Sequence, residues 1–103
     1  MAYTFNGGSL AVTTTGVRIT TSGTSASATI PNNGAGKLPT YIVVSATVAA
    51  HVRLGKTSAT AVNTDLMIQP GDSRIIQTLG NDTIAAIQAS AAGVVQVSSL
   101  DNS

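Results

Sequence analysis

The chain has 103 residues, of which 9% are charged, 3% are aromatic and none is cysteine. This length is typical of a single domain, and the lack of cysteine excludes disulfide bonds and thiolate metal sites. The 43% hydrophobic content and the net charge of +1 argue against disorder. The five basic residues lie scattered along the sequence, which argues against a nucleic-acid-binding face.

Short runs rich in Val, Ile and Thr alternate with Gly, Pro, Asn and Asp along the whole chain, a pattern typical of β-strands joined by turns. The strands predicted in the first third are residues 10–14, 17–20 and 25–30. Gly16 interrupts this alternation and predicts a bend, a bulge or a tight turn. Residues 31–39 are predicted to form a loop, because two prolines bracket Asn and Gly residues. Residues 1–30 are expected to form an arm or an outer sheet.

The remainder of the chain is more apolar and contains more predicted strands. These are residues 41–46, 49–54, 65–69, 73–79, 83–89 and 94–100. The first of them is expected to be buried on both faces or nearly so, whereas the alanines near residues 83–92 leave a helix open as an alternative there. We therefore predict one all-β domain over residues 1–103, a small β-sandwich or jelly-roll-like barrel of about eight strands.

No segment is expected to target a membrane. The most apolar stretch, residues 41–50, is shorter than the roughly 20 residues that span a bilayer. The first residues lack the basic and apolar regions of a secretory signal. The chain is expected to be made in the cytoplasm and to bind no membrane.

Two lysine-containing turns resemble fragments of a phosphate-binding loop. Gly55-Lys56-Thr57 lacks the glycine that such a loop needs five positions earlier, where Ala50 stands. Residues 34–37 end in Gly-Lys but continue into Leu and Pro, which start no helix. Both segments are therefore interpreted as turns, and no cofactor is predicted.

The groups that could carry catalysis or bind metal are few. His51 is the single histidine, and no nucleophile-elbow motif accompanies it, so we expect a strand histidine that faces solvent or a neighbouring subunit. The four carboxylates are Asp65, Asp72, Asp82 and Asp101. We interpret them as caps of turns. A calcium site that also uses Asn63 and Asn81 is an alternative without an EF-hand signature. We predict no catalytic residue, no metal site and no enzymatic activity.

Aromatic side chains are too few for a stacking platform. Tyr3, Phe5 and Tyr41 are the three aromatic residues, and Trp is absent. Recognition of sugars or of single-stranded nucleic acid uses such rings. A module that binds a small ligand or a glycan is therefore a secondary alternative.

A series of short motifs runs through residues 41–100. In order, they are Tyr41-Ile42-Val43-Val44, His51-Val52-Arg53-Leu54-Gly55, Ala59-Thr60-Ala61 before Asp65, Ile68-Gln69-Pro70-Gly71-Asp72, Ile84-Ala85-Ala86-Ile87 and Val95-Gln96-Val97. In this order the motifs resemble small β-rich structural proteins from the virions of tailed bacteriophages. The resemblance covers about 60 residues of the chain and implies a β-sandwich or jelly roll without catalytic residues.

The resemblance implies a capsid decoration or cement protein that stabilises the head by bridging coat subunits. A tail, fibre or head–tail adaptor component is the alternative within the same setting. The implied partners are the major capsid protein or other virion proteins and further copies of the chain in a homo-oligomer, with no nucleic acid. The implied location is the virion, after synthesis in the bacterial host cytoplasm.

Overall fold

The protein is built from β-strands. The computed structural model describes residues 2–5, 8–33 and 36–102, and within them the side chains of residues 16–33 and 36–100. The strands are β1 (Ala2–Phe5), β2 (Gly8–Thr20), β3 (Ala26–Thr29), β4 (Tyr41–Ala46), β5 (Ala50–Gly55), β6 (Leu66–Ile68), β7 (Ser73–Gln77), β8 (Thr83–Gln88) and β9 (Val94–Asn102). No helix that could cross a membrane occurs in the described part of the chain. The predicted all-β fold is confirmed, and the alanine-rich segment is a strand.

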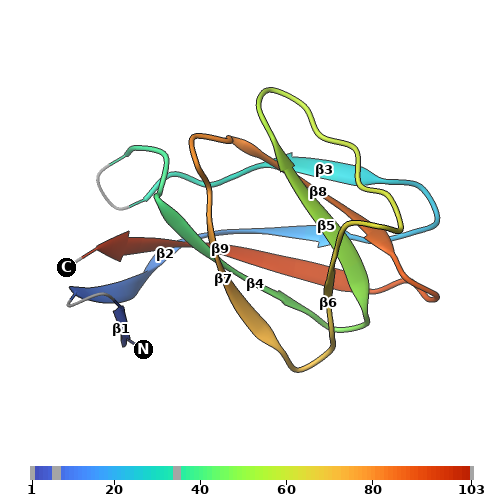
Figure 1. Ribbon diagram of the computed structural model, residues 1–103, viewed down its shortest axis with the longest axis horizontal. Helices are drawn as coiled ribbons and strands as arrows, with labels where there is room; N and C mark the ends of the chain where they lie inside the picture. The colour runs from blue at the N-terminus through green and yellow to red at the C-terminus, as the bar shows by residue number, and fades with distance from the viewer. Residues whose placement is uncertain (1, 6–7, 34–35, 103) are drawn as a thin grey trace.

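The strands form two antiparallel sheets. The five-stranded sheet has the order β1-β2-β9-β4-β7, and the four-stranded sheet has the order β3-β8-β5-β6. The sheets enclose a common apolar core, so the predicted small β-sandwich is confirmed (Figure 1). The start of β1 and the end of β9 lie at the same end of the molecule, because both strands pair with the first half of β2.

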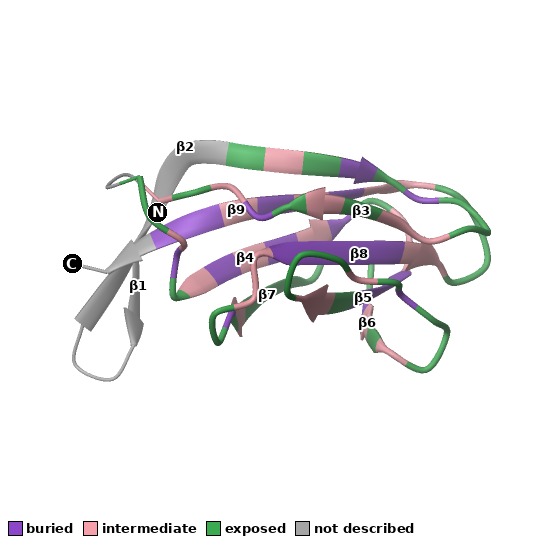
Figure 2. Cartoon of the chain, turned by 90° about the horizontal axis from the view of Figure 1, so that it is seen from above, coloured by how far each residue is buried: buried purple, intermediate pink, exposed green. Residues whose placement is uncertain are grey.

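The core lies between the sheets and is made of branched aliphatic residues and alanine. On β4, buried residues alternate with half-buried ones, so one face is turned inward and the other, predicted to be buried or nearly so, is half-buried. Figure 2 shows buried segments of β4, β8 and β9 running through the middle of the molecule. The core residues are Ile19, Ile30, Ile42, Val44, Ala46, Ala50, Val52, Ile68, Ile84, Ala86, Val95 and Val97.

The first strands differ in part from the expectation. The predicted strands at residues 10–14 and 17–20 are one strand, β2, whose pairing with β9 shifts register between Val12 and Gly16. The irregularity predicted at Gly16 is therefore confirmed as a shift within one strand. β2 belongs to the five-stranded sheet and β3 to the other. The assignment of residues 1–30 to an arm or outer sheet stays a prediction.

Candidate functional site

His51 is the second residue of β5 and is covered by the chain itself. It stands on the outward face of the four-stranded sheet, because its neighbours Ala50 and Val52 point into the core. Its residual exposure is only 7%. His51 was expected to face solvent or a neighbouring subunit, and the solvent part of this expectation is wrong, because the segment between β5 and β6 folds back over this face.

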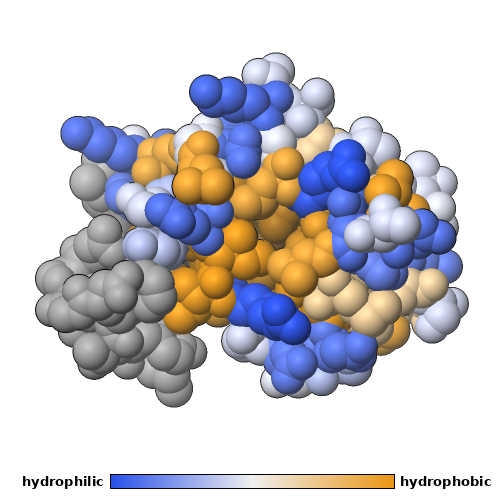
Figure 3. All heavy atoms as spheres, viewed as in Figure 1, coloured by the Kyte–Doolittle hydropathy of each residue, from blue (hydrophilic) through white to orange (hydrophobic). Residues whose placement is uncertain are grey.

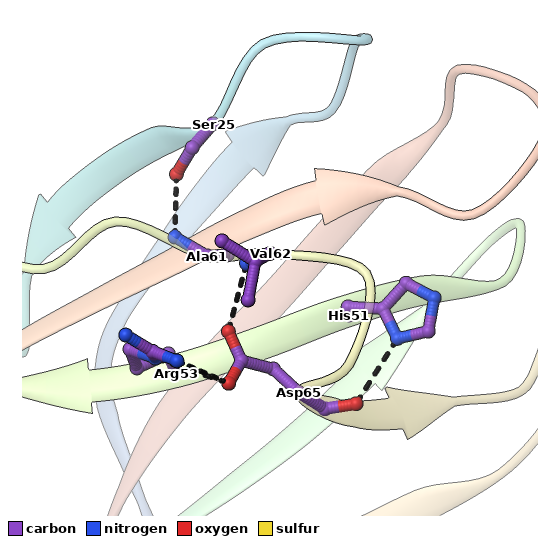
Figure 4. Close-up of polar contacts among 6 residues, drawn as sticks. All are labelled: Ser25, His51, Arg53, Ala61, Val62 and Asp65. Carbon is purple, nitrogen blue, oxygen red and sulfur yellow. Dashed lines mark hydrogen bonds and ion pairs between the residues drawn. The ribbon is translucent and has the colours of Figure 1, made fainter.

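That segment is held to β5 through Asp65. One carboxylate oxygen of Asp65, Oδ1, accepts hydrogen bonds from Nε and Nη2 of Arg53 at 3.0 and 2.9 Å. The other, Oδ2, accepts one from the Val62 N–H at 2.8 Å. Nδ1 of His51 lies 3.0 Å from the Asp65 carbonyl oxygen. Because a carbonyl oxygen only accepts, Nδ1 carries the proton. Figure 4 shows Asp65 at the centre of these contacts.

The contacts among His51, Arg53 and Asp65, which we call the Asp65 cluster, define what these side chains can do chemically. The hydrogen bond from the Val62 N–H, followed by that from Arg53, holds the pKa of Asp65 below its ordinary value. In a catalytic triad, a carboxylate would accept the proton of His51 Nδ1, but here the main chain accepts it. No hydroxyl is hydrogen-bonded to His51 in the described part of the chain. The cluster therefore fixes a loop and assembles no nucleophile.

A second carboxylate anchors the other end of the same segment. Oδ1 of Asp82 accepts hydrogen bonds from the Thr57 N–H at 2.7 Å and from the Thr83 hydroxyl at 3.0 Å. These two bonds, in this order, lower the pKa of Asp82. Thr57 has a φ of 68°, and the bond to Asp82 holds it in this uncommon conformation. The segment after Gly55 is a turn, and it is followed by no helix.

We call residues 56–65 the covering loop. Besides its two ends, it is held in the middle, where the Ala61 N–H donates to Oγ of Ser25 at 2.8 Å. Ser25 lies beside β3 and Asp65 beside β5, so the loop crosses the outward face of β8, which lies between those strands (Figure 4). Ala85, on that face, has no exposed surface. Asp65 and Asp82 thus act as anchors of this loop.

Among the described side chains, the remaining candidates named from the sequence form no metal-binding cluster. No cluster of three His, Cys, Asp or Glu that could hold a metal occurs among the described side chains. Asp72 is exposed in the turn before β7, where its N–H donates to the Gln69 carbonyl oxygen. Gly34 and the side chains of Tyr3, Phe5 and Asp101 lie outside the described parts of the chain.

β7 is exposed along most of its length. It is an edge strand with β4 as its single neighbour, and four of its five residues are exposed. They include Ile75, which retains 36% exposure. Figure 3 shows apolar residues gathered in the middle of the face that presents β5, β6 and β7. The sequence predicted the strand at β7, but no local signal marked it as an edge.

No family model matches the chain, and neither a curated protein nor a solved structure matches it. Its function is therefore inferred from its residues and their geometry.

Proposed function

We propose that the protein is a structural component of a bacteriophage virion, a decoration or cement protein that binds coat subunits and stabilises the head. The motifs in residues 41–100 suggested this role, and a small all-β domain suits it. Such a protein works through contact area and rigidity, so it needs no reactive site. We accordingly propose that it is not an enzyme.

One observation carries the proposal: His51, Arg53 and Asp65, which lie together, are engaged in holding the covering loop, whereas a backbone edge is left open. Asp65, Arg53 and His51 satisfy one another or the main chain. β7, in contrast, presents unpaired main-chain groups and an exposed Ile75. Strand edges of this kind bind partners by adding a strand to the sheet.

Two alternatives remain. A tail, fibre or head–tail adaptor component would use the same kind of contact at a different place in the particle. A module for a small ligand or glycan would need a recognition surface, usually one with aromatic side chains. Tyr41 is the one aromatic residue whose side chain is described, and it is half-buried, which favours the structural role.

The experiment is to count this chain in purified virions of the phage that encodes it, by quantitative mass spectrometry against the major coat protein. A copy number equal to that of the coat protein, or a simple fraction of it, is expected for a shell component. A number that matches tail symmetry would move the protein to the tail. Absence from the particle would overturn both assignments.

A second measurement separates decoration from mere presence. Expanded capsids that lack the protein should bind the purified chain to saturation, and their melting temperature should rise. The same capsids with an equal amount of an unrelated small β-sandwich serve as the control. Capsids that bind the chain without any gain in stability would contradict the cementing role.

A further inference from the structure

β7 is the most extensive uncovered edge among the described side chains. The other two such edge strands, β3 and β6, have four and three residues, whereas β7 has five. β7 contains no proline, and its register with β4 is continuous. Natural edges are usually blunted by proline, bulges, charge or a covering segment. Of these devices, β7 has a single charged residue, Arg74.

The pairing of β7 with β4 fixes which of its main-chain groups point outward. Thr78 and Thr40 stand opposite each other, and the Thr78 N–H donates to the Thr40 carbonyl oxygen at 2.9 Å. In an antiparallel pair, hydrogen-bonded and non-bonded positions alternate. The N–H and C=O groups of Ser73, Ile75 and Gln77 therefore point away from β4, toward the open edge. No strand lies beside them in the described part of the chain.

These outward groups are self-complementary. In an antiparallel pair of two β7 strands related by a two-fold axis at Ile75, Ile75 stands opposite its own copy and Ser73 stands opposite Gln77. Every outward N–H and C=O of these residues then gains a partner, because all the opposed pairs are hydrogen-bonded ones.

The side chains also fit this register. The two Ile75 side chains contact each other on the outward face of the sheet, which removes an exposed apolar surface from water. On the opposite face, Arg74 stands across from Ile76 of the other copy, so the two arginines are not directly opposed. The net charge of +1 adds little repulsion between copies.

We propose that the occupant of this edge is a second copy of the chain, and that the protein forms a two-fold dimer through β7. The dimer joins the two five-stranded sheets into one continuous sheet across the interface. Isologous contacts of this kind are the commonest in homo-oligomers. The proposal goes beyond the virion role and holds whether or not the chain is found in particles.

The absence of cysteine from the chain permits a direct test of the register. The axis at Ile75 brings the two Cα atoms to about 5.5 Å, which lies within the range of disulfides. Ile75→Cys should therefore convert largely to covalent dimers under mild oxidation. Val62→Cys, at a site of 39% exposure, should form them no faster than random collision allows. Equal rates for the two variants would overturn the proposal.

A mixing experiment tests the alignment further. Ser73→Cys and Gln77→Cys should each cross-link poorly alone but form a mixed disulfide when combined, because these positions face each other across the axis. In a mixture of the Ile75→Cys and Tyr3→Cys variants, preferential cross-linking between the two variants would show instead that β1 of a neighbouring copy lies beside β7, because β1 is the other edge of the sheet. That result would also overturn the two-fold pairing.

Sedimentation equilibrium of the full chain measures the association itself. The dimer fraction should rise with protein concentration, and Ile75→Lys should raise the dissociation constant at least about tenfold by placing like charges opposite each other. Val62→Lys adds the same charge elsewhere and should leave the constant unchanged. A chain that stays monomeric at every concentration would contradict the proposal. Circular dichroism of both variants should retain the β-sheet signal of the parent.

Discussion

β7 and β8 are consecutive strands with similar sequences, yet their surroundings are opposite. Both carry isoleucine and end in glutamine. β8 lies inside the four-stranded sheet, and its first four residues are buried, because the core covers one face and the covering loop the other. β7 lies at an edge and is exposed along most of its length. The contrast teaches that sheet position and loop cover, more than local composition, decide which strand is available to a partner.

The largest effect expected from this contrast concerns two isoleucines. Ile84 of β8 is fully buried. The substitution Ile84→Ala should lower the free energy of unfolding by about 2–5 kcal/mol, because it leaves a cavity in the core. Ile75→Ala on β7 should cost about 1 kcal/mol or less. Urea unfolding of dilute protein measures both without a contribution from association. Comparable losses of unfolding free energy for the two variants would contradict the contrast between β7 and β8.

A second prediction concerns the cover on β8. Ala85 has no exposed surface, so Ala85→Leu should cost about 1–3 kcal/mol by overpacking the space beneath the covering loop. The loop should also become more sensitive to limited proteolysis. Ser27→Leu, at the exposed position paired with Ala85, is the matched control and should change neither property. If Ala85→Leu left the unfolding free energy unchanged, the covering loop would not be packed closely against this face of β8.

A third prediction concerns the turn that joins the two strands. Leu79 is 77% exposed and has a φ of 54°, and Gly80 follows it with a φ of 81°. The Asn81 N–H donates to the Thr78 carbonyl oxygen, so the turn has two left-handed central residues, where Asn and Gly are favoured. Leu79→Asn should stabilise the fold by about 1 kcal/mol, as measured by urea unfolding. Leu79→Ala keeps the unfavourable backbone and should show no such gain.

The smallest effect is a dependence of stability on pH that arises at the covering loop. Asp65 and Asp82 have pKa values below their ordinary value of 3.8. Their ionised forms are favoured by folding, so this stability is present above that value and is lost as the pH falls through the lower folded pKa. Thermal unfolding across this acid range should show a smaller loss for Asp65→Asn than for the parent. Asp72→Asn, at an exposed turn, is the control.

Much of the strand pattern could be predicted from short-range sequence signals. Runs of β-branched residues located β4, β5, β7 and β9 to within a few residues, and Gly16 marked the irregular point of β2. β8 was ambiguous, because its two adjacent alanines suit a helix as well as a buried strand. Leu79 was expected in a strand and instead occupies a turn with positive φ, which a leucine does not signal.

The surroundings of the candidate residues could not be predicted, because they depend on segments far apart in the chain. His51 was expected to face solvent or a neighbouring subunit, but residues 56–65 cover it through bonds to Arg53, Ser25 and Asp82. Asp65 and Asp82 could be recognised as caps of turns. Which segments Asp65 and Asp82 connect can be stated only once the order of the strands in the two sheets is known.

Residue-resolved hydrogen exchange tests most directly the claim that β7 is the interface. In dilute protein, the amides of Ile76 and Thr78 should exchange slowly because they bond to β4, and those of Ser73, Ile75 and Gln77 should exchange fast. At high protein concentration the second set should become slow as well. Fast exchange of the second set at every concentration would contradict self-pairing at this edge.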